Sequence, residues 1–144
     1  MKTLNEYINE SSINIDKYMF HLANPVFRDS ILEKGLIPQK GASTEIHWDD
    51  MGVDLPKCVF MFKGNEEPYD STYDDDLWVI DTTNLDKSKF KKDIDDYMYK
   101  KYGSVMYTDI VDPSYITLEY KGSDGKDTTR KFMSVWKKTI KKYK

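Results

Sequence analysis

His21 is the side chain of this sequence whose position best suits chemistry. It ends a short apolar segment, residues 18–21, that we expect to be a β-strand. A helix over about residues 25–34 follows and ends at Gly35, because glycine accepts the left-handed conformation that closes a last helical turn. A neutral imidazole there, beside a helix N-terminus, can both donate and accept hydrogen bonds to a polar ligand. The alternative is a hydrogen-bonded core histidine.

The remaining reactive side chains give weaker signals. The carboxylates of residues 74–76 could bind Ca²⁺ or Mg²⁺, but consecutive aspartates lack the alternating spacing of a calcium loop, so a solvated acidic face is expected. His47 falls in a polar segment and is expected to be solvated. Cys58, the single cysteine, excludes an internal disulfide and lies in an apolar run where it should be inert. One cysteine and two histidines disfavour a zinc site.

Length and composition indicate one folded domain. The chain has 144 residues, of which 39% are hydrophobic and 33% charged, as in an ordinary globular protein. No apolar run approaches the length of a membrane span, so no membrane partner is expected. The net charge of −3 conceals an acidic stretch over residues 45–96 and a lysine-rich C-terminus. Those lysines are either a solvated face or a contact for nucleic acid or another anion.

The elements that must position His21 follow from apolar patterning. Continuous apolar runs predict buried strands over residues 58–62 and 77–81, and alternation predicts a half-buried strand over residues 115–121. Helical spacing predicts one helix over residues 87–102, ended by Gly103. The other expected elements are a strand at 105–108, a returning strand at 128–135, a helical lysine-rich end, and long loops at 39–57 and 65–76. Strands therefore outnumber helices, which indicates an α+β fold.

The first dozen residues resemble a targeting leader. The segment begins Met-Lys-Thr, continues to Glu6-Tyr7-Ile8, and is similar to the capsid-targeting leader of internal proteins from T4-like bacteriophages. Such leaders are cleaved by the prohead protease after Leu/Ile-x-Glu, a pattern that residues 4–6 and 8–10 both fit. The resemblance implies a leader at 1–10 and one domain at 11–144, in a protein of the virion interior that is delivered into the host cytoplasm. The alternative is an N-terminal helix docked on the domain.

The order of the core motifs resembles an ADP-ribosyltransferase-like domain. The resemblance rests on His21, on the helix that ends Gly35-Leu36-Ile37-Pro38, on residues 59–61 and 77–81, and on residues 112–116. It spans about residues 18–120 and implies an α+β fold with a split β-sheet, few helices, and a cleft that binds NAD as substrate.

The same resemblance implies roles for particular residues. His21, with Leu22 beside it, would hold the ribose next to nicotinamide, and Tyr69, Ser71 and Tyr73 are candidates for the nicotinamide pocket. Glu119 would be the catalytic carboxylate, because a fixed anion stabilises the positive charge that develops on the ribose. The Gln/Glu-x-Glu pair of the family is missing, since position 117 is threonine.

Three functions follow as hypotheses. The first is a phage-delivered enzyme that transfers ADP-ribose from NAD to a host target during host takeover. The second is a non-enzymatic phage protein of the same fold that binds and inhibits a host defence protein, which the missing Glu pair favours. The third is a DNA-associated protein of the capsid interior, which the C-terminal lysines favour. The scarcity of arginine, with two in the chain, argues against a dedicated phosphate clamp.

Overall fold

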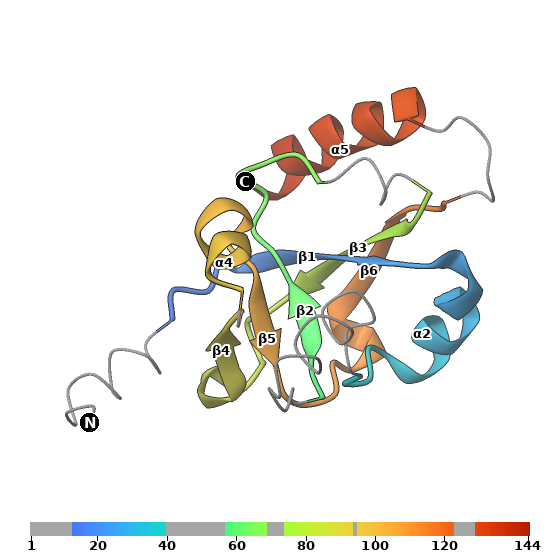
Figure 1. Cartoon of the computed structure of the whole chain (residues 1–144). Helices are drawn as coiled ribbons and strands as arrows, with labels where there is room; N and C mark the ends of the chain where they lie inside the picture. Colours follow the sequence, from blue (N-terminus) through green and yellow to red (C-terminus); the bar gives the residue numbers. More distant parts are fainter. Residues whose placement is uncertain (1–12, 40–56, 69–73, 94, 123–128) are drawn as a thin grey trace, which may run out of the picture.

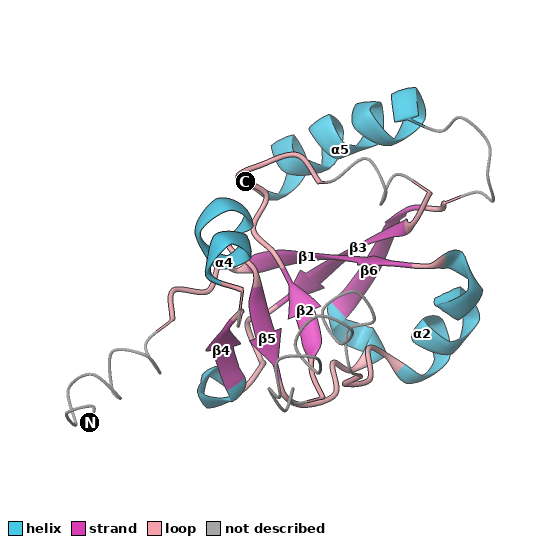
Figure 2. Cartoon of the chain, in the orientation of Figure 1, coloured by secondary structure: helices cyan, strands magenta, loops and turns pink. Residues whose placement is uncertain are grey.

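Two small antiparallel sheets and three α-helices make up the described part of the chain (Figures 1 and 2). The computed structural model describes residues 13–39, 57–68, 74–93, 95–122 and 129–144. The strands are β1 (Tyr18–Ala23), β2 (Val59–Met61), β3 (Asp76–Asp81), β4 (Phe90–Lys92), β5 (Val105–Tyr107) and β6 (Ile116–Tyr120). The helices are α2 (Arg28–Lys34), α4 (Asp96–Tyr102) and α5 (Thr129–Tyr143), with short 3₁₀ turns at Pro25–Phe27, Lys87–Lys89 and Pro113–Tyr115. The expected α+β fold is confirmed in that helices are combined with antiparallel sheets.

The first sheet has the strand order β1-β3-β6, with β3 in the centre. β3 is buried on both faces because its neighbours and two separate layers cover it. Trp78 and Ile80 point into one apolar cluster, whereas Leu77 and Val79 point into a second cluster on the opposite face. A continuous apolar run is what a strand covered on both faces requires, so the prediction of a buried strand here is confirmed.

The second sheet, β2-β5-β4, packs over the Trp78 face of the first sheet. The two sheets meet where the backbones of Phe20 and Phe62 exchange two hydrogen bonds of 2.9 Å. α2 closes the same core through Ile31, and Gly35 ends this helix at φ 83°. A Cβ at Gly35 would overlap the carbonyl oxygen of Val111, which pairs with Leu36. The expected stop at Gly35 is therefore confirmed, and close approach as well as φ requires glycine there.

α5 covers the other face of the first sheet, as Figure 1 shows. Phe132 and Trp136 are buried one helical turn apart and pack on Phe20, Leu77 and Val79. The Phe20 and Trp136 rings meet edge to face with centroids 5.3 Å apart, a favourable aromatic geometry. The prediction of a strand over residues 128–135 is wrong, because this apolar face repeats with a helical period of 3.6 residues.

The prediction of one helix over residues 87–102 is also wrong. A 3₁₀ turn and β4 occupy its first half, where Phe90 is buried opposite Tyr107 of β5. α4 begins later because the Asp95 side chain caps it, accepting hydrogen bonds from the backbone N–H groups of Tyr97 (3.1 Å) and Met98 (3.4 Å). The expected helix end at Gly103 is confirmed.

Candidate functional site

His21 lies on β1, opposite Trp78 of β3, on the face of the sheet that turns toward β2. Its Nδ1 lies 2.6 Å from the carbonyl oxygen of Phe60 on β2. Phe60 is two residues before Phe62, which directly follows β2 and forms an isolated antiparallel bridge with Phe20 of β1. The imidazole therefore links the two sheets beside the point where their backbones separate.

The contact with Phe60 defines which nitrogen of the His21 imidazole carries the proton. A carbonyl oxygen only accepts hydrogen bonds, so Nδ1 carries the proton and donates it. Burial lowers the pKa of His21 below its usual value, and the bond to the Phe60 carbonyl opposes this effect without overcoming it. At neutral pH the ring is uncharged, and its Nε2 is the acceptor atom. Chemically, His21 can accept one hydrogen bond from a ligand at Nε2.

Trp78, the strand partner of His21, carries an unsatisfied donor. Its side chain is fully buried, and within the described residues its indole Nε1–H finds no acceptor. Buried polar groups are rarely left without a partner. Sequence reasoning assigned Trp78 only to the core, because an apolar run gives no indication of where an indole N–H will point.

Glu119 lies on the other face of the first sheet. Leu118 pairs with Trp78 and Tyr120 pairs with Leu77, so Glu119 is the extra residue of a β-bulge. Its carboxylate accepts a hydrogen bond from the hydroxyl of Tyr143 and forms an ion pair of 3.3 Å with Lys142 Nζ, and both partners lie on α5. Burial, followed by the bond to Glu119, raises the pKa of Tyr143. Glu119 is a docking residue for α5 in this structure.

The residues proposed for one cleft are not gathered in one place. His21 faces β2 while Glu119 faces α5, so the sheet separates them. Leu22 follows His21 on β1 and packs in the α5 cluster, on the Glu119 side. Tyr69, Ser71 and Tyr73 lie outside the described residues, as do His47 and the N-terminal leader. A surface hollow of about 390 Å³ lies between the start of β1 and the end of α5, away from His21.

A buried ion pair, which sequence reasoning missed, connects α2 with the first sheet. Arg28 donates from Nε to Asp76 Oδ2 (2.8 Å) and from Nη2 to Asp76 Oδ1 (2.7 Å), a bidentate arrangement. The Gly122 N–H also donates to Asp76 Oδ1 at 2.7 Å. The expectation of a fully solvated acidic run at residues 74–76 is therefore wrong, since Asp76 is fully buried. Burial, together with the charges of Asp74 and Asp76, raises the pKa of Asp75 to about 6.

Cys58 is buried beside β2. Burial, followed by the charge of Asp93, raises the pKa of its thiol to about 11. At neutral pH the thiolate is scarce, so this cysteine is a poor nucleophile. Within the described residues, no three His, Cys, Asp or Glu side chains come together as metal ligands would.

Comparison of the chain with protein-family models, with curated proteins and with solved structures finds no match. In the described part of the chain, none of the helices combines the length and the apolar character that crossing a membrane requires.

Proposed function

We propose that this chain is a phage-delivered binding protein of ADP-ribosyltransferase-like architecture that inhibits a host defence protein by surface contact. The observation that supports a non-enzymatic role is the separation of His21 from Glu119. A transferase needs its ribose-binding and charge-stabilising groups on one cleft. Here Glu119 is engaged by Tyr143 and Lys142 on the opposite face of the sheet from His21.

The surface around α2 supports contact with a protein. Among described residues, most of the exposed large apolar side chains belong to this helix, its flanks or the segment paired with it: Val26, Phe27, Leu32, Ile37 and Ile110. Leu36 pairs with Val111 in antiparallel fashion, which sets Ile37 next to Ile110. Exposed apolar side chains gathered in one region are typical of protein-binding surfaces.

The phage context rests on the N-terminal resemblance. A leader with prohead-protease sites at residues 4–6 and 8–10 would bring the protein into the virion interior and then, with the DNA, into the host cytoplasm. A protein delivered together with the DNA is present before new synthesis begins, which suits an early inhibitor of host defence.

The experiment is capture of host proteins from lysate by the purified chain. We expect a retained host protein whose capture is lost in the double variant Leu32→Asp/Ile37→Asp. The matched control is Tyr97→Asp on α4, another exposed large apolar residue, which should retain capture. If no host protein is retained, and turnover of NAD is observed and lost in His21→Ala, the proposal fails.

A second candidate is transfer of ADP-ribose from NAD to a host target, with His21, Leu22, Tyr69, Ser71 and Tyr73 at the NAD site and Glu119 as catalytic carboxylate. The position of His21 where two small sheets separate favours it, because the implied family binds NAD at a split sheet. Calorimetry with NAD tests it. Loss of tenfold or more in affinity for His21→Ala, about 1.4 kcal/mol, supports this candidate. Absence of NAD binding in both proteins rejects it.

A further inference from the structure

The charge of this molecule is strongly divided. Residues 129–144 contain seven basic residues and no acidic residue, a formal charge of +7. Residues 1–128 contain the remaining 15 basic residues and all 25 acidic residues, a formal charge of −10. The basic segment is almost entirely α5, so the positive charge is concentrated on one rigid element.

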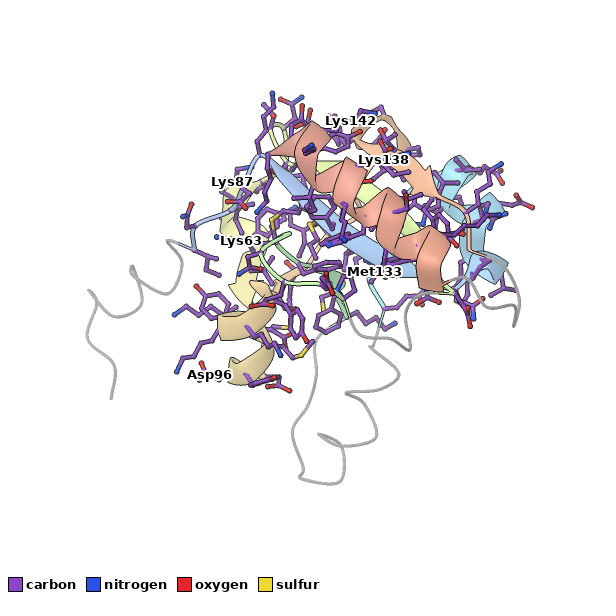
Figure 3. All side chains as sticks on the ribbon, turned by 90° about the horizontal axis from the view of Figure 1, so that it is seen from above. Lys63, Lys87, Asp96, Met133, Lys138 and Lys142 are labelled. Atoms are coloured by element: carbon purple, nitrogen blue, oxygen red, sulfur yellow. The ribbon has the colours of Figure 1, made fainter. Side chains whose placement is uncertain are left out.

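Most lysines of α5 occupy the side of the helix that faces away from the sheet. Figure 3 looks down on α5 where it crosses the strands, with Lys138 and Lys142 labelled. Residues Phe132 and Trp136 point into the core, and at 100° per residue the opposite side of the helix carries four exposed lysines: Lys131, Lys137, Lys138 and Lys141. We call these four residues the lysine face. With a rise of 1.5 Å per residue, the lysine face is about 15 Å long.

The lysine face is not used by the fold. Lys142 pairs with Glu119 and Lys144 pairs with Asp16, so these two lysines attach α5 to the domain. Within the described residues, the side chains of the four members of the lysine face make no hydrogen bond and no ion pair. Four like charges on one helix face repel each other, and no intrahelical acidic partner offsets this cost. Such a face gains most from an external polyanion.

The exposed side of α5 suits duplex DNA better than a lipid surface. A helix that lies in a lipid surface inserts an apolar face. The apolar face of α5 is buried against the sheet, and its described residues include no exposed large apolar side chain. Lysines contact phosphates as mobile point charges, without the bidentate geometry by which arginine reads carboxylates and bases. Duplex DNA offers about one charge per 1.7 Å of its axis, a density that a 15 Å row of lysines complements.

We propose that the lysine face of α5 binds the phosphate backbone of duplex DNA without sequence preference. This activity is separate from the proposed contact with a host protein, because α2 and α5 lie on different parts of the structure (Figure 1). The acidic remainder of the chain is repelled by DNA, so it orients the molecule with α5 toward the duplex.

The test is fluorescence anisotropy of a labelled duplex of arbitrary sequence, about two helical turns long. Four phosphate contacts predict a slope of log K against log salt near −3.6, which is a loss of about 150-fold in affinity between 50 and 200 mM salt. The variant Lys137→Gln/Lys138→Gln/Lys141→Gln should reduce this slope by about 2.7 and weaken binding at 50 mM salt by more than about tenfold. All replaced side chains are exposed, so folding, checked by circular dichroism, should be retained.

The matched control makes the same change in net charge elsewhere. Lys34→Gln/Lys57→Gln/Lys91→Gln replaces three exposed lysines outside α5 and should bind like the unaltered protein. Equal weakening by both triple variants would show that net charge alone matters and would overturn the proposal. It would also be overturned if the unaltered protein does not bind DNA at 50 mM salt. Binding of polyglutamate or of anionic vesicles as tightly as DNA would overturn the assignment of DNA as the partner.

Discussion

Replacing Arg28 with methionine tests the buried ion pair that connects α2 with β3. Methionine keeps much of the apolar stem but removes the guanidinium, while the Asp76 side chain remains 0% exposed. Removing one partner of a buried pair costs about 3–5 kcal/mol. Because the Arg28 side chain is 25% exposed, and Gly122 still donates to Asp76, we expect the lower end, about 3 kcal/mol less free energy of unfolding at pH 7.

The assay is equilibrium unfolding in urea, followed by tryptophan fluorescence and circular dichroism. The slope of the free energy of unfolding against urea concentration should stay unchanged, since the variant alters stability rather than the surface exposed on unfolding. A double-mutant cycle with Asp76→Asn isolates the pair, because asparagine still accepts from the Gly122 N–H. We expect a coupling free energy of about 1–3 kcal/mol between positions 28 and 76.

An exposed pair provides the control. Lys100 and Asp96 form a 2.9 Å ion pair on α4 with side chains 74% and 75% exposed. Lys100→Met should leave the midpoint of unfolding within error, because such pairs contribute little. If Arg28→Met loses less than about 0.5 kcal/mol, the value expected of a surface pair, our reasoning that burial makes this pair structural is refuted.

Two further predictions concern backbone conformation and pH. Gly35→Ala should lower the free energy of unfolding in urea by more than about 2 kcal/mol. The added Cβ would overlap the Val111 carbonyl oxygen, and alanine would also have to adopt a positive φ. Gly103→Ala, with φ 65° and side-chain atoms of Lys63 rather than backbone as its nearest neighbours, should cost less, about 1–2 kcal/mol, and a loss equal to that of Gly35→Ala would contradict this reasoning. The raised pKa of Asp75 favours its protonated form in the folded state, so its contribution to stability is lost as pH rises through about 6. The difference in free energy of unfolding between Asp75→Asn and the unaltered protein should therefore grow in favour of the variant by about 1 kcal/mol as pH rises from about 4 to about 7.5, after allowance for the partial exposure of Asp75. A difference that does not change with pH would show that the pKa of Asp75 is not raised.

The sequence predicts elements well where local chemistry decides them. The apolar run of β3, the helix stop at Gly35 and the alternation of β6 each follow from a rule that acts within a few residues. The segment 87–102 fails because its helical spacing competes with pairing between Phe90 and Tyr107, which are distant in sequence. In α5 the helical spacing of Phe132 and Trp136 is a local signal, which the strand predicted over residues 128–135 overlooked, whereas the sheet face that they cover is set by the tertiary fold.

The candidate site depends on long-range geometry still more strongly. The sequence indicates His21 because it ends an apolar segment, whereas its link to Phe60 depends on where β1 and β2 separate. The bulge at Glu119 sets this residue and Tyr120 toward α5, and a bulge leaves no residue-type signal here. The pairing of Arg28 with Asp76, 48 residues apart, has no local signature either.

The covering of the first sheet by α5 has a consequence for the order of events during synthesis. Phe20, Leu77 and Val79 are made early, yet their face of the sheet is buried only when Phe132 and Trp136 arrive. A nascent chain that has emerged as far as β6 therefore leaves these apolar side chains uncovered. Burial of that face must wait until α5 has left the ribosome, because Phe132 and Trp136 supply its covering side chains.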